Sequence, residues 1–270
     1  MSDNNNFQEL IKNLKSLNDD KVVSHVLPES KIKVSLKPLQ AKHISKINSS
    51  LLASASQSVK KTMFNKLVEQ ILNEILVLPE ETSYSDFTIF DYYFLLFTLR
   101  ESINPVLTVS DDGTEVTVDI KEKLKEYTST KFKTKLNKIG GKTCEVYLRT
   151  PSYKLMRRFE DITNERQISE EKKGEKNYDM EGLVRDMFSF SIIPYIEKIK
   201  TLVDGNEEEI PFVDLSTSQK VGILDLIPSE LYKKLIDGIG KLNEPIDKLL
   251  STENDDIKIP LDQTFLIDSE

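Results

Sequence analysis

The sequence predicts an α+β protein with a mainly helical core and short antiparallel β-hairpins or a small sheet. The first observation is the segment 86–103, in which large apolar side chains occupy most positions, as in a helix buried on nearly every side. The second is a set of long stretches with apolar residues three and four positions apart. The third is a set of short alternating segments joined by turn residues, which is typical of hairpins.

Length, charge and cysteine content limit the class of protein. A chain of 270 residues can bury a sizeable core, as one large domain or two smaller ones. Cys144 is the only cysteine, and only His25 and His43 could join it as soft ligands, which excludes a four-ligand structural zinc site within one chain. The start, MSDNNNFQEL, lacks the basic and apolar regions of a signal peptide, so we expect the product to stay where it is synthesised.

The first two regions are 1–20 and 21–105. In 1–20, apolar residues at helical spacing predict a short amphipathic helix that docks on the body or on a partner. In 21–105, Ile32, Val34 and Leu36 alternate with lysines, which predicts a half-buried strand ended by Pro38. Helical spacing then continues from about residue 44 to Pro79, and we expect that helical region to pack on the core helix.

The core helix itself is predicted over 86–103, with Thr88 as its cap and Asp91 in its first turn. Crossing a bilayer takes about 20 mostly uncharged residues. This segment is shorter and is closely flanked by charges such as Arg100 and Glu101, so we interpret it as the core of a soluble domain.

Region 106–151 is predicted to form β-hairpins. The turn signal SDDGT separates strands at 106–109 and 115–120. A second alternating pair, 132–136 and 144–148, is joined through Gly140 and Gly141, which suit a turn that requires positive φ.

Region 152–270 is predicted to be a C-terminal helical region. Within it, the charge-rich segment 160–181 has poor periodicity and is expected to be a mobile connection with some helix in it. The helical pattern over 183–202 includes Pro194 as a kink or a break, and 210–213 is expected to be extended. Further helices are expected from Asp214 or Ser216 to Ile227 and from Pro228 to Leu250. The final run 257–267 is expected to return to the body as a strand.

The residues do not single out a catalytic site, and we expect neither an enzyme nor a cofactor or metal. Carboxylates are numerous, but their spacing selects no pair for glycoside hydrolysis. The SDDGT turn lacks the ligand positions of a calcium loop, and the turn at Gly140 lacks the spacing of a phosphate-binding loop. Cys144 is the one candidate nucleophile, with His25 or His43 as its base, although its alternation with Val146 and Leu148 favours a core position.

Nucleic-acid binding is another class of function to consider. It would depend on the lysine rows Lys31, Lys33 and Lys37, or Lys131, Lys133, Lys135 and Lys138. Because the formal net charge is −8, and a duplex-binding surface needs concentrated positive charge, we expect no nucleic-acid partner.

Several stretches carry a resemblance to a known family: VLPESKIKVSLKPLQAKHISKI, LVEQILNEI leading into FTIFDYYFLLFTLRESINP, KTCEVYLRTPSYKLM, and IPYIEKIKTLVDGNEEEIPFVDLSTSQKVGILDLIPSELYKKL. In this order, over roughly residues 26 to 267, the chain resembles the baseplate hub proteins of T-even-like contractile-tailed bacteriophages. The likeness lies in the order and texture of the segments, since no catalytic signature defines such proteins.

The resemblance implies a structural, hub-type component of the tail baseplate of a myovirus, assembled in the host cytoplasm and located in the virion. Its partners would be other baseplate and tail proteins, with no membrane and no small-molecule substrate. The alternative is an assembly factor or chaperone for the hub that the mature virion does not retain. For partner contacts we expect large apolar residues exposed on the terminal segments, namely Phe7, Leu10, Phe265 and Leu266.

Overall fold

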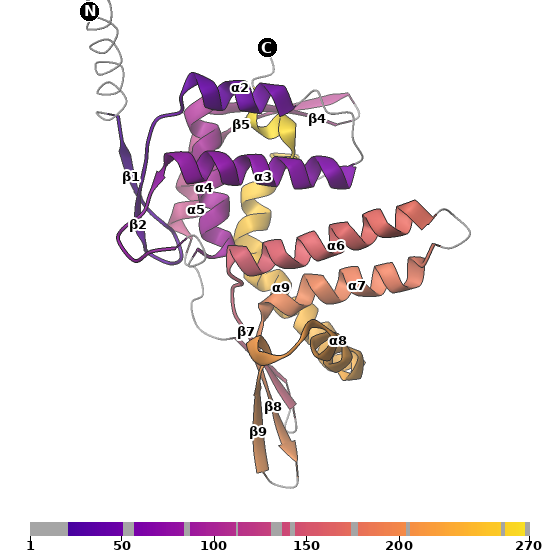
Figure 1. The fold of residues 1–270 in the computed structure, drawn as a ribbon. Coiled ribbons are helices and arrows are strands. Elements are labelled where there is room, and N and C mark those ends of the chain that lie inside the picture. Colours follow the sequence, from indigo (N-terminus) through magenta and orange to yellow (C-terminus); the bar gives the residue numbers. More distant parts are fainter. Residues whose placement is uncertain are drawn as a thin grey trace, which may run out of the picture. The chain divides into compact units, whose positions relative to one another are not determined.

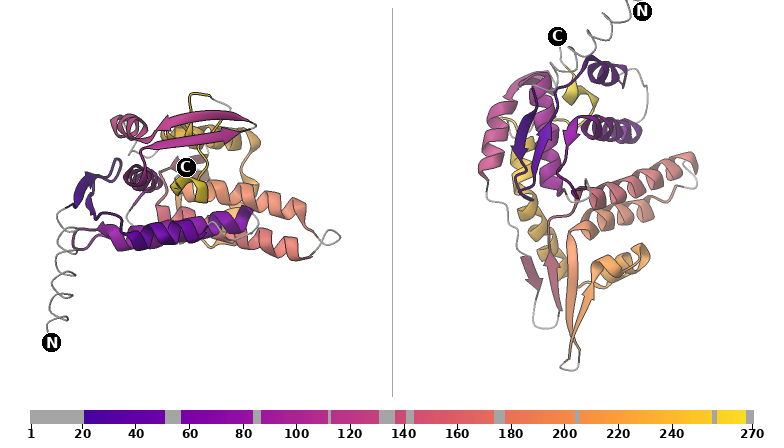
Figure 2. Two further views of the ribbon diagram at one scale, coloured as in Figure 1. Left: turned by 90° about the horizontal axis from the view of Figure 1, so that it is seen from above. Right: turned by 60° about the vertical axis from the view of Figure 1, so that its left-hand side comes forward.

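Two units that interleave in sequence make up the chain (Figures 1 and 2). A computed structural model describes residues 21–50, 57–83, 87–111, 113–130, 137–140, 144–173, 178–203, 206–254 and 257–267. The first unit comprises Met1–Ser83, Phe94–Leu124 and Thr252–Glu270, and the second comprises Tyr84–Tyr93 and Lys125–Ser251. Within the described ranges helices predominate and all strand pairs are antiparallel, which confirms the α+β prediction.

The first unit begins with a small sheet and two helices. Strands β1 (Val23–Val26), β2 (Lys33–Leu36) and β3 (Leu76–Val77) form an antiparallel sheet with β2 in the middle. As the alternation predicted, β2 buries Val34 and Leu36 and exposes Lys33. Helices α2 (Ala41–Ser50) and α3 (Gln57–Ile75) are linked by Glu74 of α3, whose carboxylate pairs with the Nζ atoms of Lys42 and Lys46 of α2 at 2.6 Å each.

The rest of the first unit contains the predicted hairpin. Strands β4 (Val106–Asp111) and β5 (Thr114–Asp119) pair in register, and Gly113 in the turn has φ of +81°. Helix α5 (Ile120–Ser129) follows at once, and the Asp119 carboxylate accepts a hydrogen bond from the Lys121 backbone N–H at 2.9 Å. Gly113 therefore forms the turn of the hairpin, and Asp119 at the end of β5 caps the helix that follows.

Helix α4 (Ile89–Ile103) is the predicted core helix, and the division between the two units falls inside it, after Tyr93. The cap is reciprocal: the Asp91 N–H donates to Thr88 Oγ1 and the Thr88 N–H donates to Asp91 Oδ2, both at 3.3 Å. Its buried residues are Ile89, Phe90, Asp91, Tyr92, Phe94, Leu95, Leu96, Phe97, Thr98, Leu99 and Arg100. Burial on nearly every side is thus confirmed.

The second unit contains a four-stranded antiparallel sheet. Its strands, in spatial order, are β6 (Asn137–Gly140), β7 (Cys144–Leu148), β8 (Ile196–Val203) and β9 (Asn206–Pro211). Gly140 has φ of +146°, and a Cβ added there would lie 2.2 Å from the Cys144 carbonyl oxygen, so only glycine fits. The expected strand 132–136 and the second turn glycine, Gly141, lie outside the described residues.

Four helices share a hydrophobic core with this sheet. They are α6 (Tyr153–Lys173), α7 (Met180–Ile192), α8 (Thr217–Leu226) and α9 (Ser229–Leu250), with short 3-10 turns η3 (Ile193–Tyr195) and η4 (Phe212–Asp214). Of these helices, α9 packs against β6 and β7. The core that they enclose includes Val146, Leu148, Phe159, Phe190, Ile199, Phe212, Leu224, Leu235 and Leu242. Helix α8 starts with a full capping box of Ser216 and Gln219, which confirms Ser216 as the cap.

Two expectations about the C-terminal half are wrong, and a third is confirmed for its helical part. The segment 160–181 is helical as far as Lys173, because buried side chains such as Phe159 and Glu170 anchor α6. The helix expected over 183–202 ends at Ile192, so Pro194 lies at a break, as one of the two alternatives expected. The residues after it form the 3-10 turn Ile193–Tyr195 and strand β8 in place of a helix. The final segment carries the 3-10 helix η5 (Gln263–Leu266) in place of a strand.

Candidate protein-interaction surface

The hairpin of α6 and α7 is the most distinctive surface element of the second unit (Figure 1). One face of α7 is packed inward: Leu183, Phe190 and Ile192 are buried. The ring of Phe190 lies against that of Phe159 of α6, with centroids 5.5 Å apart. This apolar seam fixes which face of α7 turns away from the core.

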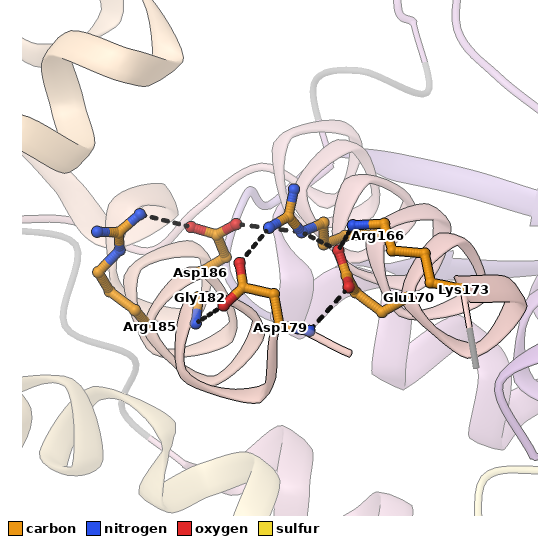
Figure 3. A network of polar contacts seen from close by, with 7 residues as sticks. All are labelled: Arg166, Glu170, Lys173, Asp179, Gly182, Arg185 and Asp186. Atoms are coloured by element: carbon orange, nitrogen blue, oxygen red, sulfur yellow. Dashed lines mark hydrogen bonds and ion pairs between the residues drawn. The ribbon is translucent and has the colours of Figure 1, made fainter. Parts of the chain in front are cut away.

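A polar network ties the end of α6 to the beginning of α7 (Figure 3). The Arg166 guanidinium lies 3.1 Å from Asp179 Oδ2 and 3.8 Å from Asp186 Oδ2. The Glu170 side chain is fully buried, receives Lys173 Nζ at 2.6 Å, and accepts a hydrogen bond from the Asp179 backbone N–H at 3.0 Å. Two helices are thus joined through several charged contacts in one place.

The same network explains the start of α7 and the ionisation of Glu170. Asp179 Oδ1 accepts a hydrogen bond from the Gly182 N–H at 3.0 Å, which makes Asp179 the N-cap. The hydrogen bonds from Lys173 and from the Asp179 backbone hold the pKa of Glu170 below its ordinary value. Glu170 is therefore a carboxylate at neutral pH, and its negative charge is compensated by the adjacent Lys173 and Arg166.

The outward face of α7 carries a line of exposed apolar side chains, which we call the α7 stripe: Met180, Val184, Met187 and Phe188. Their exposed fractions are 59%, 41%, 44% and 59%, respectively. Positions three and four apart share one face of a helix, so these side chains are contiguous. A contiguous apolar face on a helix that is held rigidly from behind is a common form of protein-binding surface.

The sequence-predicted partner residues do not form this surface. Phe7 and Leu10 lie outside the described residues. The expected exposure of Phe265 and Leu266 is wrong, because η5 turns both inward and leaves them 0% and 1% exposed. The ring of Phe265 lies 5.1 Å from that of Phe97 in the first unit's core.

The signal for the α7 stripe was nevertheless present in the sequence. Met180, Val184, Met187 and Phe188 repeat at helical spacing, but so do Leu183 and Phe190, and both sets are apolar. A helix with apolar residues on both faces gives no indication of which face is buried. Only the packing of α6 against α7 separates them.

The candidate nucleophile is not supported by its surroundings. Cys144 lies on β7 in the second unit and is half-buried. Burial, and to a smaller extent the negative charge of Glu145, raises the pKa of its thiol, which disfavours the reactive thiolate. His43 in the first unit has its Nε2 3.1 Å from Glu74 Oε2 and its Nδ1 accepting the Gln40 N–H. In the parts of the chain that the structure describes, no group of three or more His, Cys, Asp or Glu side chains is arranged to hold a metal ion.

One cleft in the second unit contains lysines from two elements. It has a volume of about 370 Å³ and is lined by Lys138, Ile139 and Gly140 of β6 and by Lys234, Asp237, Gly238 and Lys241 of α9. Lys138 is paired with Glu145, and Lys234 lies 3.8 Å from Glu230. Two of the three lysines that line the cleft therefore have a carboxylate within salt-bridge distance.

Comparison with protein-family models, with curated proteins and with solved structures gave no match to this chain. Among the described residues, no helix has the length and apolar character needed to cross a membrane. The α7 stripe is therefore the feature on which a functional proposal can be built from the structure.

Proposed function

We propose that this protein is a structural subunit that acts by binding other proteins through the α7 stripe, as a hub-type component of a contractile phage tail baseplate. The observation that carries the proposal is the exposed apolar line on α7, held in place from behind by Phe190 and by the Glu170 network. The resemblance of the segment order to baseplate hub proteins supplies the biological setting.

Exposure of the α7 stripe to water costs free energy. Apolar surface left in water forgoes about 25 cal/mol per Å², so a line of four large side chains gains appreciably from being covered. A preformed helix also loses little conformational entropy when a partner binds. Both factors suit a subunit whose role is assembly.

The test is a particle assay that uses matched variants. Val184→Glu places a charge in the stripe, whereas Ile236→Glu makes the same change on α9 at a side chain that is also 41% exposed. Val184→Glu is expected to abolish incorporation into baseplates while Ile236→Glu is incorporated normally. Equal incorporation of the two folded variants would refute binding through the stripe.

The same assay separates a subunit from an assembly factor. Mass spectrometry of purified virions is expected to recover the chain at a stoichiometric level. Recovery of assembled baseplates without the chain would instead support the assembly-factor alternative, in which the stripe is covered only during construction.

A further inference from the structure

Strand β1 lies at an edge of the first unit's sheet. It pairs with β2 on one side, and in the described part of the chain its other side has no partner strand. The run 22–26, VVSHV, contains no Asp, Glu, Lys, Arg or Pro, and three of its five residues are β-branched. Sheets commonly protect an exposed edge with charges, prolines or very short strands. The opposite edge strand, β3, has two residues, whereas β1 has neither form of protection.

The hydrogen bonding of β1 shows which backbone groups lie on its open side. The Leu27 N–H donates to the Ile32 carbonyl at 2.9 Å, so the backbone groups of Leu27 point toward the returning chain. In an antiparallel pair, alternate residues point their N–H and C=O to the same side, so Val23 and His25 also point toward β2. The residues between them then point their N–H and C=O away from the sheet, namely Val22, Ser24 and Val26.

A second hydrogen bond agrees with this assignment. The Lys37 N–H donates to the Ile75 carbonyl at 2.8 Å, so the backbone groups of Lys37 point toward β3. Those of its neighbour Leu36 therefore point toward β1, where Leu36 pairs with Val23. Both bonds place the groups of Val23 on the β2 side of β1.

The side chains of β1 are also open at this edge. Val23 shares the inner face of the sheet with Leu36, yet Val23 is 55% exposed and Leu36 is 9% exposed. On the outer face, Val22 and Val26 are 40% and 56% exposed. A strand added at the edge would place a side chain about 4.5–5.5 Å from Val23 on the same face. One added strand would thus cover the valines and pair the free backbone groups.

We propose that β1 pairs antiparallel with β1 of a second copy of this chain, about a two-fold axis at Ser24. The two three-stranded sheets then join into one continuous sheet. Ser24 faces the partner subunit's Ser24, and Val22 faces the partner subunit's Val26. Each facing pair of outward residues exchanges two backbone hydrogen bonds. The contact belongs to the first unit and does not depend on the α7 stripe.

The run 22–26 suits pairing with its own copy. Its outward residues read valine, serine, valine in both directions, so valine meets valine and serine meets serine on the outer face. On the inner face, Val23 meets the partner subunit's His25. No two lysines or carboxylates face each other across the new pair, and like charges in facing positions are what destabilises strand pairs. A two-fold contact requires this kind of self-complementary surface.

The contact is small, so the dimer depends on concentration. Five residues from each subunit bury less than the roughly 1,200–2,000 Å² of stable specific interfaces. We therefore expect a reversible equilibrium between monomer and dimer, which sedimentation velocity detects as the concentration of the full chain is raised. A chain that stays monomeric at the highest attainable concentration would overturn the proposal.

Charges placed at Ser24 test the position of the axis. Ser24→Lys brings two like charges together in the dimer and should raise the dissociation constant about fivefold, and Ser24→Glu should do the same. An equimolar mixture of the two variants should form a mixed dimer that is tighter than the dimer of either variant alone. Thr117→Lys, at an exposed residue of β5, is the control and should leave the constant unchanged. Equal dissociation constants for Ser24→Lys and Thr117→Lys, or no mixed dimer, would refute an axis at Ser24.

Disulfide formation tests the direction of pairing. Facing Cα atoms of an antiparallel hydrogen-bonded pair are about 5.5 Å apart, which is within the range of a disulfide. Val22→Cys and Val26→Cys, each in a Cys144→Ser background, should form a covalent dimer under mild oxidation when they are mixed and little when each is oxidised alone. Cross-linking of each variant with itself would indicate parallel pairing. That result, or no cross-linking in the mixture, would contradict the antiparallel contact.

Discussion

Glu170 near the end of α6 accepts a hydrogen bond from the backbone N–H of Asp179, the residue that caps α7. A buried carboxylate thus holds the cap of the next helix, and the two helices are joined at the point where the chain reverses (Figure 3). This contact makes the hairpin a single support for the stripe on its outer face.

Removing the charge of Glu170 should loosen the hairpin. Glu170→Gln keeps the shape but removes the negative charge that faces Lys173 and Arg166. It also turns one of the two oxygens that accept from Lys173 and from the Asp179 N–H into an NH₂ donor, so one of these hydrogen bonds is lost. We expect a lower thermal midpoint and faster hydrogen exchange at the Gly182 amide. Glu171→Gln, an exposed neighbour on α6, is the control, and equal effects from both variants would contradict the role of Glu170.

The link between α2 and α3 should depend on pH. Hydrogen bonds from Lys42, Lys46 and His43 lower the pKa of Glu74 from 4.5 to about 2. Because the folded pKa lies below the unfolded one, the stabilisation is present above about pH 4.5 and is lost as the pH falls toward 2. The destabilisation caused by Glu74→Gln should therefore be full at pH 6 and shrink by pH 2.5, as measured by urea unfolding.

Truncation of two phenylalanines on α7 should change the stability of the protein by very different amounts. Phe190 is 8% exposed and packs on Phe159, so Phe190→Ala should cost about 3–5 kcal/mol of unfolding free energy. Phe188 is 59% exposed, and Phe188→Ala should change stability by no more than about 0.5 kcal/mol. Chemical denaturation of both variants measures the contrast. A large loss for Phe188→Ala would mean that its ring is packed within the chain.

Two glycines in α9 form a matched pair. At Gly240 an added Cβ meets nothing within 4 Å, so Gly240→Ala should stabilise the helix by about 1 kcal/mol. At Gly238 it would lie 2.3 Å from Ile139 Cδ1 and 3.0 Å from Leu148 Cδ1, which forces these side chains to move. Gly238→Ala should therefore be less stable than Gly240→Ala by about 1 kcal/mol or more in thermal or chemical unfolding. Equal gains would show that the contact of α9 with β6 is loose.

The purified chain should not be retained on DNA in a salt-dependent way. The net charge is −8, and Lys138 and Lys234 of the lysine-lined cleft have acidic neighbours. Retention on a DNA column at low salt that is lost at high salt would revive nucleic-acid binding as a function.

Local signals in the sequence were sufficient for the elements that they specify directly. The dense apolar segment produced α4, Thr88 and Ser216 produced their caps, and SDDGT produced the β4–β5 hairpin. The fold class followed from these elements together.

What the sequence could not supply depends on contacts between distant segments. Charge density in 160–181 suggested a mobile connection, yet burial of Glu170 against the start of α7 makes most of it helix. Likewise, the two units interleave, so the consecutive regions 21–105, 106–151 and 152–270 follow the order of the elements and not the packing. The α7 stripe is visible only once the inner face of α7 is known.

The composition of the edge strand β9 protects the sheet against pairing with strands of other molecules. It lies at one end of the described strand order and carries Glu207, Glu208 and Glu209 in succession before Pro211. Consecutive like charges and a proline, which lacks a backbone N–H, discourage another strand from adding to a sheet margin. Growth of fibres or amorphous aggregates by strand addition is thereby suppressed at β9.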